Sequence, residues 1–257
     1  MKDERLITSL QNDTVKLTKL LQTDSRRRRK EGLIVLEGVR LVGDALAAGA
    51  RPVHALFSPE LTDGTLRERV RGAGGTVLAV SEAVLHHAAD TQQPQGVVAV
   101  FAMPASRLPA QPRAVLILDA LRDPGNLGTI LRTAAAAGVE AVLLAPTCVD
   151  PYNPKSLRAG MGAHFRVPLA QRDWDEIALY CSQHSVYLAD GAGDLTYDRA
   201  DWSGRWALVI GGEAHGAGGE ASRLAQHRIR IPMAADTESL NAAVAAAVIL
   251  FEARKYG

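Results

Sequence analysis

The chain has 257 residues, of which 47% are hydrophobic and 22% charged, with 29 Lys and Arg against 28 Asp and Glu. This composition excludes a wholly disordered chain and suits one large or two small globular domains. No run of about 18 apolar residues occurs, two cysteines are too few for a disulfide framework, and the N-terminus lacks the apolar block of a signal peptide. We therefore expect a soluble, cytoplasmic protein without a membrane segment.

The first half of the chain predicts a small α/β domain. Leucines at roughly helical spacing predict a helix over residues 3–21. Short apolar runs predict strands at 33–36, 53–57, 76–80 and 97–101, with helices between the first three. Residues 103–113 contain three prolines, which resist both helix and sheet, so we place a linker there between domains 1–102 and 114–257.

Positive charge is concentrated at the start of the chain. The first 30 residues hold nine Lys and Arg against four Asp and Glu. Such an excess attracts phosphate groups, although a charged run can also be a solvated helix end. Five of the cations are consecutive: Arg26, Arg27, Arg28, Arg29 and Lys30.

The second half alternates strands and helices more clearly. Apolar runs predict strands at 114–118, 141–145, 186–188, 206–210 and 228–231, and the periodicity predicts helices at 126–137, 174–182 and 240–254. Strands separated by helices indicate a mostly parallel sheet that is buried on both faces.

Several common functional motifs are missing. No Gly-x-Gly-x-x-Gly follows a strand, and neither a phosphate-binding P-loop nor a Gly-x-Ser-x-Gly elbow occurs. His86 and His87 are adjacent and lack the spacing of two metal ligands on a helix, so we expect no metal ion.

Three segments place polar residues or glycines beside predicted strand and helix ends. The first follows the strand at 114–118 with a turn signal at 123–125, then Asn126 as a helix N-cap and Arg132 in a helix of mostly small and apolar residues. An arginine on such a face can simply extend its charge to solvent, so this segment alone leaves both readings open.

The second and third segments lie further along. Gly211, Gly212 and Glu213 follow a strand, at the sheet edge where open α/β sheets bind ligands. A glycine-rich turn with a capping glutamate is the alternative. The third segment leads from Ile231 and Met233 to an alanine-rich helix, for which we predict Ser239 as the N-cap. Leu240 and Asn241 also lie at this helix start, where backbone N–H groups favour anions and polar ligands.

In their order and spacing, the three segments resemble the motifs of the SpoU/TrmH branch of the SPOUT RNA methyltransferases. The resemblance covers residues 114–257. Residues 1–102 resemble, more weakly, the L30e-like substrate-binding domain of many members, through residues 33–49 and 95–99. The resemblance implies a C-terminal α/β domain with a trefoil knot, a homodimer, and S-adenosylmethionine as cofactor.

The resemblance also assigns roles to individual residues. It implies cofactor binding by Gly211, Gly212, Ile231, Met233, Leu240 and Asn241, and catalysis by Arg132, Asn126, Glu213, Ser239 and Asn241. The basic run from Arg26 to Lys30 would bind RNA. The implied function is methyl transfer to a ribose 2′-hydroxyl of 23S-type ribosomal RNA. The alternatives are the same reaction on transfer RNA, or a non-catalytic RNA-binding protein of this fold.

Overall fold

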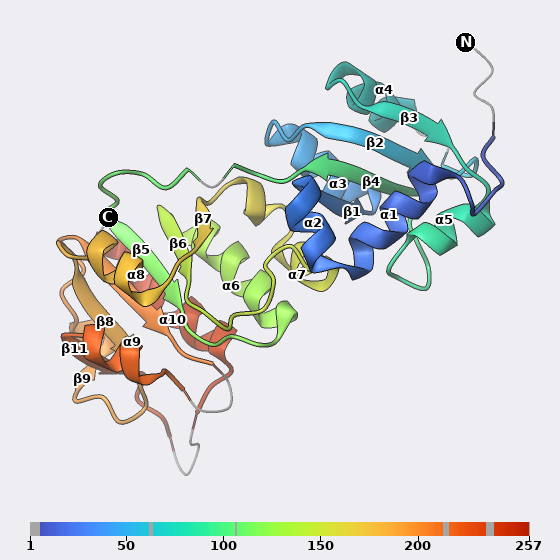
Figure 1. The fold of residues 1–257 in the computed structure, drawn as a ribbon. Helices are drawn as coiled ribbons and strands as arrows, with labels where there is room; N and C mark the ends of the chain where they lie inside the picture. Colours follow the sequence, from blue (N-terminus) through green and yellow to red (C-terminus); the bar gives the residue numbers. More distant parts are fainter. Residues whose placement is uncertain (1–5, 62–63, 106, 213–215, 235–238, 257) are drawn as a thin grey trace. The chain divides into compact units, whose positions relative to one another are not determined.

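The structure is a computed structural model that describes residues 6–61, 64–105, 107–212, 216–234 and 239–256. The chain forms two compact units, each with its own sheet and helices (Figure 1). Residues 1–105 and 152–165 make up the first unit, and residues 106–151 and 166–257 the second. No helix in the described ranges combines the length and the apolar character that a membrane crossing requires.

The first unit is built on a mixed four-stranded sheet. Its strands are β1 (Leu33–Glu37), β2 (Pro52–Phe57), β3 (Thr76–Ala79) and β4 (Val97–Ala102). Their order in the sheet is β1-β4-β2-β3. β4 pairs antiparallel with β1 and β2, whereas β2 and β3 run parallel. All four predicted strands of this half are thus confirmed.

Helices pack on this sheet. They are α1 (Asp13–Thr23), α2 (Ser25–Glu31), α3 (Val39–Ala47), α4 (Gly64–Gly72), α5 (Glu82–Ala88) and α7 (Pro154–Gly160). Val15 of α1 and Leu85 of α5 share a buried cluster with Val35 of β1. Because side chains alternate along a strand, Ile34 and Leu36 point to the opposite face, and both are fully buried there.

Of the helix predicted over 3–21, residues 3–5 lie outside the described ranges and residues 6–12 are not helical, so the prediction is wrong for 6–12. The helix begins at Asp13, where Asn12 caps it by accepting hydrogen bonds from the backbone N–H groups of Thr14 and Val15. Ahead of the helix, Ile7 forms a parallel bridge with Val80, next to the end of β3. Pairing with a distant strand therefore replaces the first helical turns.

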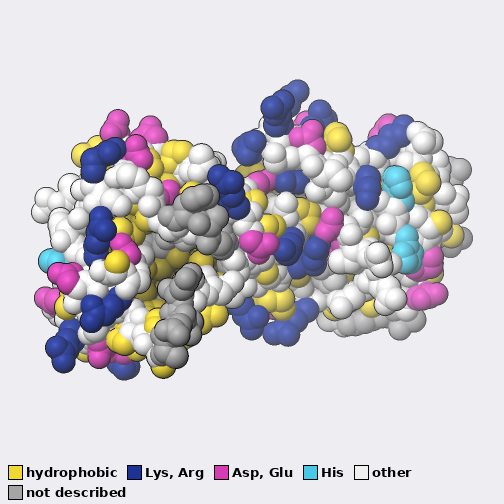
Figure 2. Space-filling view, turned by 90° about the horizontal axis from the view of Figure 1, so that it is seen from below, with side chains coloured by type: hydrophobic (Ala, Val, Ile, Leu, Met, Phe, Trp, Pro, Cys, Tyr) yellow, Lys and Arg dark blue, Asp and Glu magenta, His cyan; other side chains and the backbone are white. Residues whose placement is uncertain are grey.

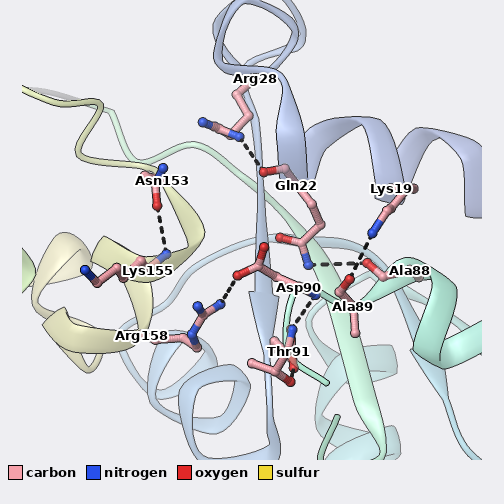
Figure 3. A network of polar contacts seen from close by, with 11 residues as sticks. Lys19, Gln22, Arg28, Ala88, Ala89, Asp90, Thr91, Asn153, Lys155 and Arg158 are labelled. Atoms are coloured by element: carbon pink, nitrogen blue, oxygen red, sulfur yellow. Dashed lines mark hydrogen bonds and ion pairs between the residues drawn. The ribbon is translucent and has the colours of Figure 1, made fainter. Parts of the chain in front are cut away.

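The first unit also includes a segment from far along the chain. α7 is followed by a 3-10 turn (Ala163–Phe165), and α7 packs against β1. Figure 3 shows Arg158 of α7 beside Asp90, which lies just after α5; Arg158 Nη1 is 2.7 Å from Asp90 Oδ2. The sequence pattern does not predict this excursion, because it depends on long-range packing.

The second unit contains a wholly parallel sheet. Its strands are β5 (Ala114–Leu118), β6 (Ala141–Leu144), β7 (Leu169–Gln171), β8 (Ser185–Ala189), β9 (Leu195–Thr196), β10 (Trp206–Ile210) and β11 (His227–Arg230). The sheet order is β7-β6-β5-β10-β8-β11-β9, and each pairing is parallel. This confirms the predicted parallel sheet.

Helices bury both faces of this sheet. They are α6 (Pro124–Ala137), α8 (Trp174–Tyr180), α9 (Gly219–Leu224) and α10 (Ala242–Ala253). Ile177 of α8 and Ala221 of α9 share a buried cluster with Ile117 of β5. The neighbouring strand residues Leu116 and Leu118 face the other way and are also fully buried. α6 and α10 pack side by side and run in the same direction.

Candidate active site

A pocket of about 760 Å³ lies in the second unit, where β8, β10 and β11 end and α10 begins. Open parallel sheets bind ligands at this carboxyl edge, and pockets of roughly 300–1,000 Å³ hold small molecules. In Figure 2, the unit on the left has a hollow in which hydrophobic side chains gather. The pocket wall includes all six residues predicted for cofactor binding: Gly211, Gly212, Ile231, Met233, Leu240 and Asn241.

The two glycines after β10 lie where backbone segments cross closely. A Cβ atom on Gly211 would stand 2.3 Å from the backbone nitrogen of Ala217, and one on Gly212 would stand 2.5 Å from the carbonyl oxygen of Ala120. Backbone atoms cannot move aside as a flexible side chain can, so only glycine fits at either position. The wall formed by this segment is therefore bare main chain.

Asn241 joins the start of α10 to α6. Its Oδ1 accepts hydrogen bonds from the N–H groups of Ala243, at 2.8 Å, and Val244, at 3.4 Å. Its Nδ2 donates to Asn126 Oδ1 at 3.1 Å. The N-cap predicted at Ser239 is therefore wrong: Asn241 caps the helix, while Ser239 is exposed and lines the pocket.

The cap predicted at Asn126 is also wrong. α6 begins at Pro124, and the carboxylate of Asp123 accepts a hydrogen bond from the N–H of Asn126 at 2.8 Å. Proline suits the first helical position because its missing N–H would have no partner there. Asn126 is thereby placed in the first turn, where its Oδ1 accepts the hydrogen bond from Asn241. The helix ends at Ala137, as predicted, and Gly138 follows it in a left-handed conformation.

Arg132 lies on α6, six residues after Asn126, and its side chain is exposed. It does not line the pocket of its own chain. It forms no hydrogen bond or ion pair with any residue that the structure describes. The described structure thus brings together Asn126 and Asn241 beside the pocket, but leaves Arg132 outside the pocket wall.

Glu213 falls outside the described residues, so the structure does not place it. The chain on either side of it is well fixed. Gly212 and Gly216 exchange two backbone hydrogen bonds of 3.1 Å, and the N–H of Gly218 donates to the buried carboxylate of Asp119 at 2.6 Å. These contacts anchor the loop between β10 and α9 to the end of β5.

Charged residues on the pocket wall were missed by sequence reasoning. Asp190 follows β8, and Arg228 and Arg230 belong to β11. Arg228 Nη1 lies 3.3 Å from Asp190 Oδ2, and Arg230 donates to the carbonyl oxygen of Gly193 at 2.5 Å. The one available signal was the position of Asp190 two residues after the predicted parallel strand at 186–188.

The predicted RNA-binding run forms α2, and its five cations differ in exposure. Arg26, Arg29 and Lys30 are exposed. Arg27 is half-buried and pairs with Glu31 at 3.0 Å. Arg28 is only 3% exposed, and its Nη1 donates to the carbonyl oxygens of Leu21, at 2.7 Å, and Gln22, at 3.2 Å. Arg28 therefore holds α2 against α1, and the other four cations face outward in whole or in part.

The reactive side chains that lie outside the pocket have surroundings that suit a structural role. Burial raises the pKa of the Cys181 thiol to about 12, so it is not a thiolate at neutral pH. His86 and His87 lie in the last turn of α5. Within the described ranges, no group of three or more His, Cys, Asp or Glu could hold a metal ion.

Both halves of the chain are similar to known proteins. Residues 113–251 match the SpoU rRNA Methylase family, and residues 12–99 match the MRM3-like substrate binding domain. The 23S rRNA (guanosine(2553)-2′-O)-methyltransferase RlmP of Bacillus subtilis is 35% identical over 96% of this chain and 98% of its own length. The mitochondrial rRNA methyltransferase 3 of Mus musculus is 36% identical over 89% of this chain, which spans 68% of that relative.

Solved structures show the same likeness. The AdoMet-bound rRNA methyltransferase from Sinorhizobium meliloti is 33% identical, with a TM-score of 0.87. The alignment covers 98% of this chain and 97% of that structure, so both units have counterparts there.

Proposed function

The chain belongs to the SpoU rRNA Methylase family, and from that premise we propose that it transfers the methyl group of S-adenosylmethionine to a ribose 2′-hydroxyl of ribosomal RNA. The observation that carries this proposal is the pocket at the carboxyl ends of β8, β10 and β11. Its wall combines the glycines, the apolar residues and the asparagine that the family resemblance assigns to the cofactor.

The pocket suits S-adenosylmethionine, which supplies an electrophilic methyl group on a sulfonium. Gly211 and Gly212 expose main-chain groups that can hydrogen-bond a polar ligand. Ile231, Met233 and Leu240 give the wall an apolar part that suits an adenine ring. The side chain of Asn241 is held at the start of α10 by its own cap, so its position is fixed before any ligand enters.

Arg132 supplies the positive charge that the nucleophile needs. An alcohol keeps its proton at neutral pH, so the attacking ribose oxygen requires a base or a positive field. Arginine stays protonated in proteins. Arg132 therefore stabilises the developing alkoxide and holds the neighbouring phosphate. The hydroxyl proton passes to water, the oxygen forms its bond to the methyl carbon, and S-adenosylhomocysteine leaves with the electron pair of the broken S–CH3 bond. Asn126, Glu213, Ser239 and Asn241 orient the ribose and the cofactor.

The active site is completed by a second copy of the chain. Arg132 is exposed and outside its own pocket, and α10, which packs beside α6, presents Val244 and Phe251 with 49% and 48% of their surfaces exposed. Large apolar side chains on one helix face favour association. A homodimer that covers this face brings Arg132 of one copy to the pocket of the other.

The C-terminal segment forms a trefoil knot, a rare exception to the rule that protein chains are unknotted. The close backbone crossings at Gly211 and Gly212 support this, because a chain threaded through a loop needs small residues where it crosses. The first unit contacts the RNA, with the outward-facing cations of α2 on its phosphates.

Methyl transfer can be tested with radiolabelled S-adenosylmethionine and RNA from cells that lack the protein. We expect label in ribosomal RNA, at a ribose 2′-oxygen identified by nuclease digestion and mass spectrometry. Label in transfer RNA alone would contradict the proposed substrate, and label on a base would contradict the proposed chemistry. Failure to bind S-adenosylmethionine by calorimetry would indicate a non-catalytic RNA-binding protein.

A further inference from the structure

We propose that Asp190 binds the ribose diol of the cofactor and makes the pocket selective for an intact adenosyl ribose. The inference rests on the proposed use of S-adenosylmethionine. Asp190 directly follows β8, at the sheet edge that forms the pocket. It is the one acidic side chain among the described residues of the pocket wall.

The backbone holds Asp190 in a fixed position. Its N–H donates to the carbonyl oxygen of Ile229 at 2.9 Å, and its Oδ1 accepts from the N–H of Ala192 at 2.9 Å. Gly193 packs so closely on β11 that a Cβ atom there would lie 2.8 Å from the carbonyl oxygen of Arg228. The loop is thus fixed at both ends, and the carboxylate is oriented before a ligand binds.

The carboxylate retains capacity for further hydrogen bonds. Each of its oxygens can accept about two. Within the described chain, Oδ1 accepts from Ala192, and Oδ2 has the Arg228 guanidinium at 3.3 Å. The two side chains are 30% and 51% exposed, and ion pairs this exposed contribute only about 0–1 kcal/mol to stability. The Asp190–Arg228 pair therefore contributes little to the stability of the fold, but it orients a carboxylate on the pocket wall.

The chemistry of a vicinal diol matches this group. Two neighbouring hydroxyls donate two hydrogen bonds, and a carboxylate accepts both, as acidic residues do for the ribose in dinucleotide-binding folds. The other charged groups of the described wall, Arg228 and Arg230, are donors only. Asp190 is the one charged acceptor on the described wall, and loss of a hydroxyl would therefore remove a charge-assisted hydrogen bond.

Calorimetry with S-adenosylhomocysteine and its 2′-deoxy and 3′-deoxy analogues tests the assignment. For the wild-type protein, we expect at least one deoxy analogue to bind about tenfold more weakly than the parent, as loss of a charged hydrogen bond predicts. Asp190→Asn should bind the parent about tenfold more weakly and show no further loss with that analogue. Asp194→Asn changes the same charge on the same loop outside the pocket wall, and it should behave as wild type.

Two results would overturn the role of Asp190 while leaving the proposed function intact. One is that the wild-type protein binds both deoxy analogues as tightly as the parent, a measurement that needs no variant. The other is that Asp190→Asn, shown to be folded by its melting temperature, still loses affinity as much as wild type when the hydroxyl is removed. If the wild-type protein bound neither S-adenosylhomocysteine nor S-adenosylmethionine, the proposed function and this inference would both be wrong.

Discussion

Arg132 is the residue on which the proposed chemistry depends most, and its exposed position on α6 separates its role from cofactor binding. Replacing it with alanine removes the positive charge beside the attacking oxygen. We expect Arg132→Ala to lower kcat by about a hundredfold or more, as loss of a charge-stabilising group typically does. The affinity for S-adenosylmethionine, measured by calorimetry, should stay unchanged.

Arg172, which is half-buried and lies 3.7 Å from Glu176 in the same unit, provides the control for Arg132. Arg172→Ala removes an equal charge and should methylate RNA at the wild-type rate. Near-normal turnover by Arg132→Ala would show that the alkoxide is stabilised by another group.

His54 gives the first unit a pH-dependent stability. Its ring is buried, with Nε2 2.8 Å from Thr18 Oγ1, and burial lowers its pKa from 6.5 to about 4. The unfolded chain therefore takes up a proton near pH 6.5 that the folded chain excludes until about pH 4. Stability should fall as the pH drops through this window, by up to ~3 kcal/mol.

Urea unfolding of wild type and His54→Gln at pH 7 and pH 4.5 measures this effect, because glutamine stays neutral across the range. The variant should lose less stability than wild type on acidification. An equal loss in both proteins would show that His54 is not the group responsible.

The sequence predicted which residues surround the pocket better than it predicted their local roles. The motif spacing led to Gly211, Leu240 and Asn241, which meet in the pocket wall. Ser239 and Asn126 were predicted as helix caps because their residue types suit caps, yet Asn241 and Asp123 fill those positions. Each segment contains several residues whose types can cap a helix, and the conformation of the backbone determines which of them does.

The segment after β10 makes a clear prediction about backbone crossing. Gly211→Ala places a methyl group 2.3 Å from a backbone nitrogen, so the loop must shift and the pocket wall with it. We expect this variant to lose at least tenfold in S-adenosylmethionine affinity and to melt at a lower temperature. Gly204→Ala in the same unit meets nothing within 4 Å and should match wild type in both measurements.

The two sides of α2 should respond differently to neutralisation. Replacing the exposed Arg26, Arg29 and Lys30 with glutamine should weaken RNA binding. The slope of log K against log salt concentration should become shallower by about two to three, because fewer phosphate contacts form and fewer counterions are released on binding. Cofactor affinity should not change. Filter binding at several salt concentrations measures the slope, and an unaltered slope would place the RNA elsewhere.

Arg28→Gln tests the inward side of the same helix. Arg28 donates to two buried carbonyl oxygens, so its loss should destabilise the protein by about 1–3 kcal/mol. Denaturant unfolding measures this loss. A variant as stable as wild type but weakened in RNA binding would reverse the assigned roles.

At the scale of elements, apolar runs predicted strands such as β5 and β10 to the residue, because fully buried parallel strands are continuous in hydrophobicity. Elements held by distant partners were harder. α7 packs with the first unit although its neighbours in sequence belong to the second, and the start of α1 gives way to the bridge between Ile7 and Val80. Local periodicity in the sequence cannot predict contacts with such distant partners.

At the level of the whole molecule, we propose that two copies of the chain meet at each active site. In the proposed dimer, the pocket of one copy would receive Arg132 from the other, with the exposed face of α10 between them. The residue pattern alone does not show that Arg132 is exposed outside its own pocket, because its exposure depends on how α6 packs in the folded chain.

The most direct test is to coexpress Arg132→Ala and Gly211→Ala chains with different affinity tags and to purify the dimers that carry both tags. One site in each mixed dimer then has an intact pocket from one chain and Arg132 from the other. At an S-adenosylmethionine concentration too low to fill the Gly211→Ala pocket, each variant alone should be at least tenfold slower than wild type, and we expect the mixed dimers to reach about half the methyl-transfer rate of wild-type dimers. Mixed dimers as inactive as the single variants would show that each chain must supply its whole site, which would contradict the shared active site.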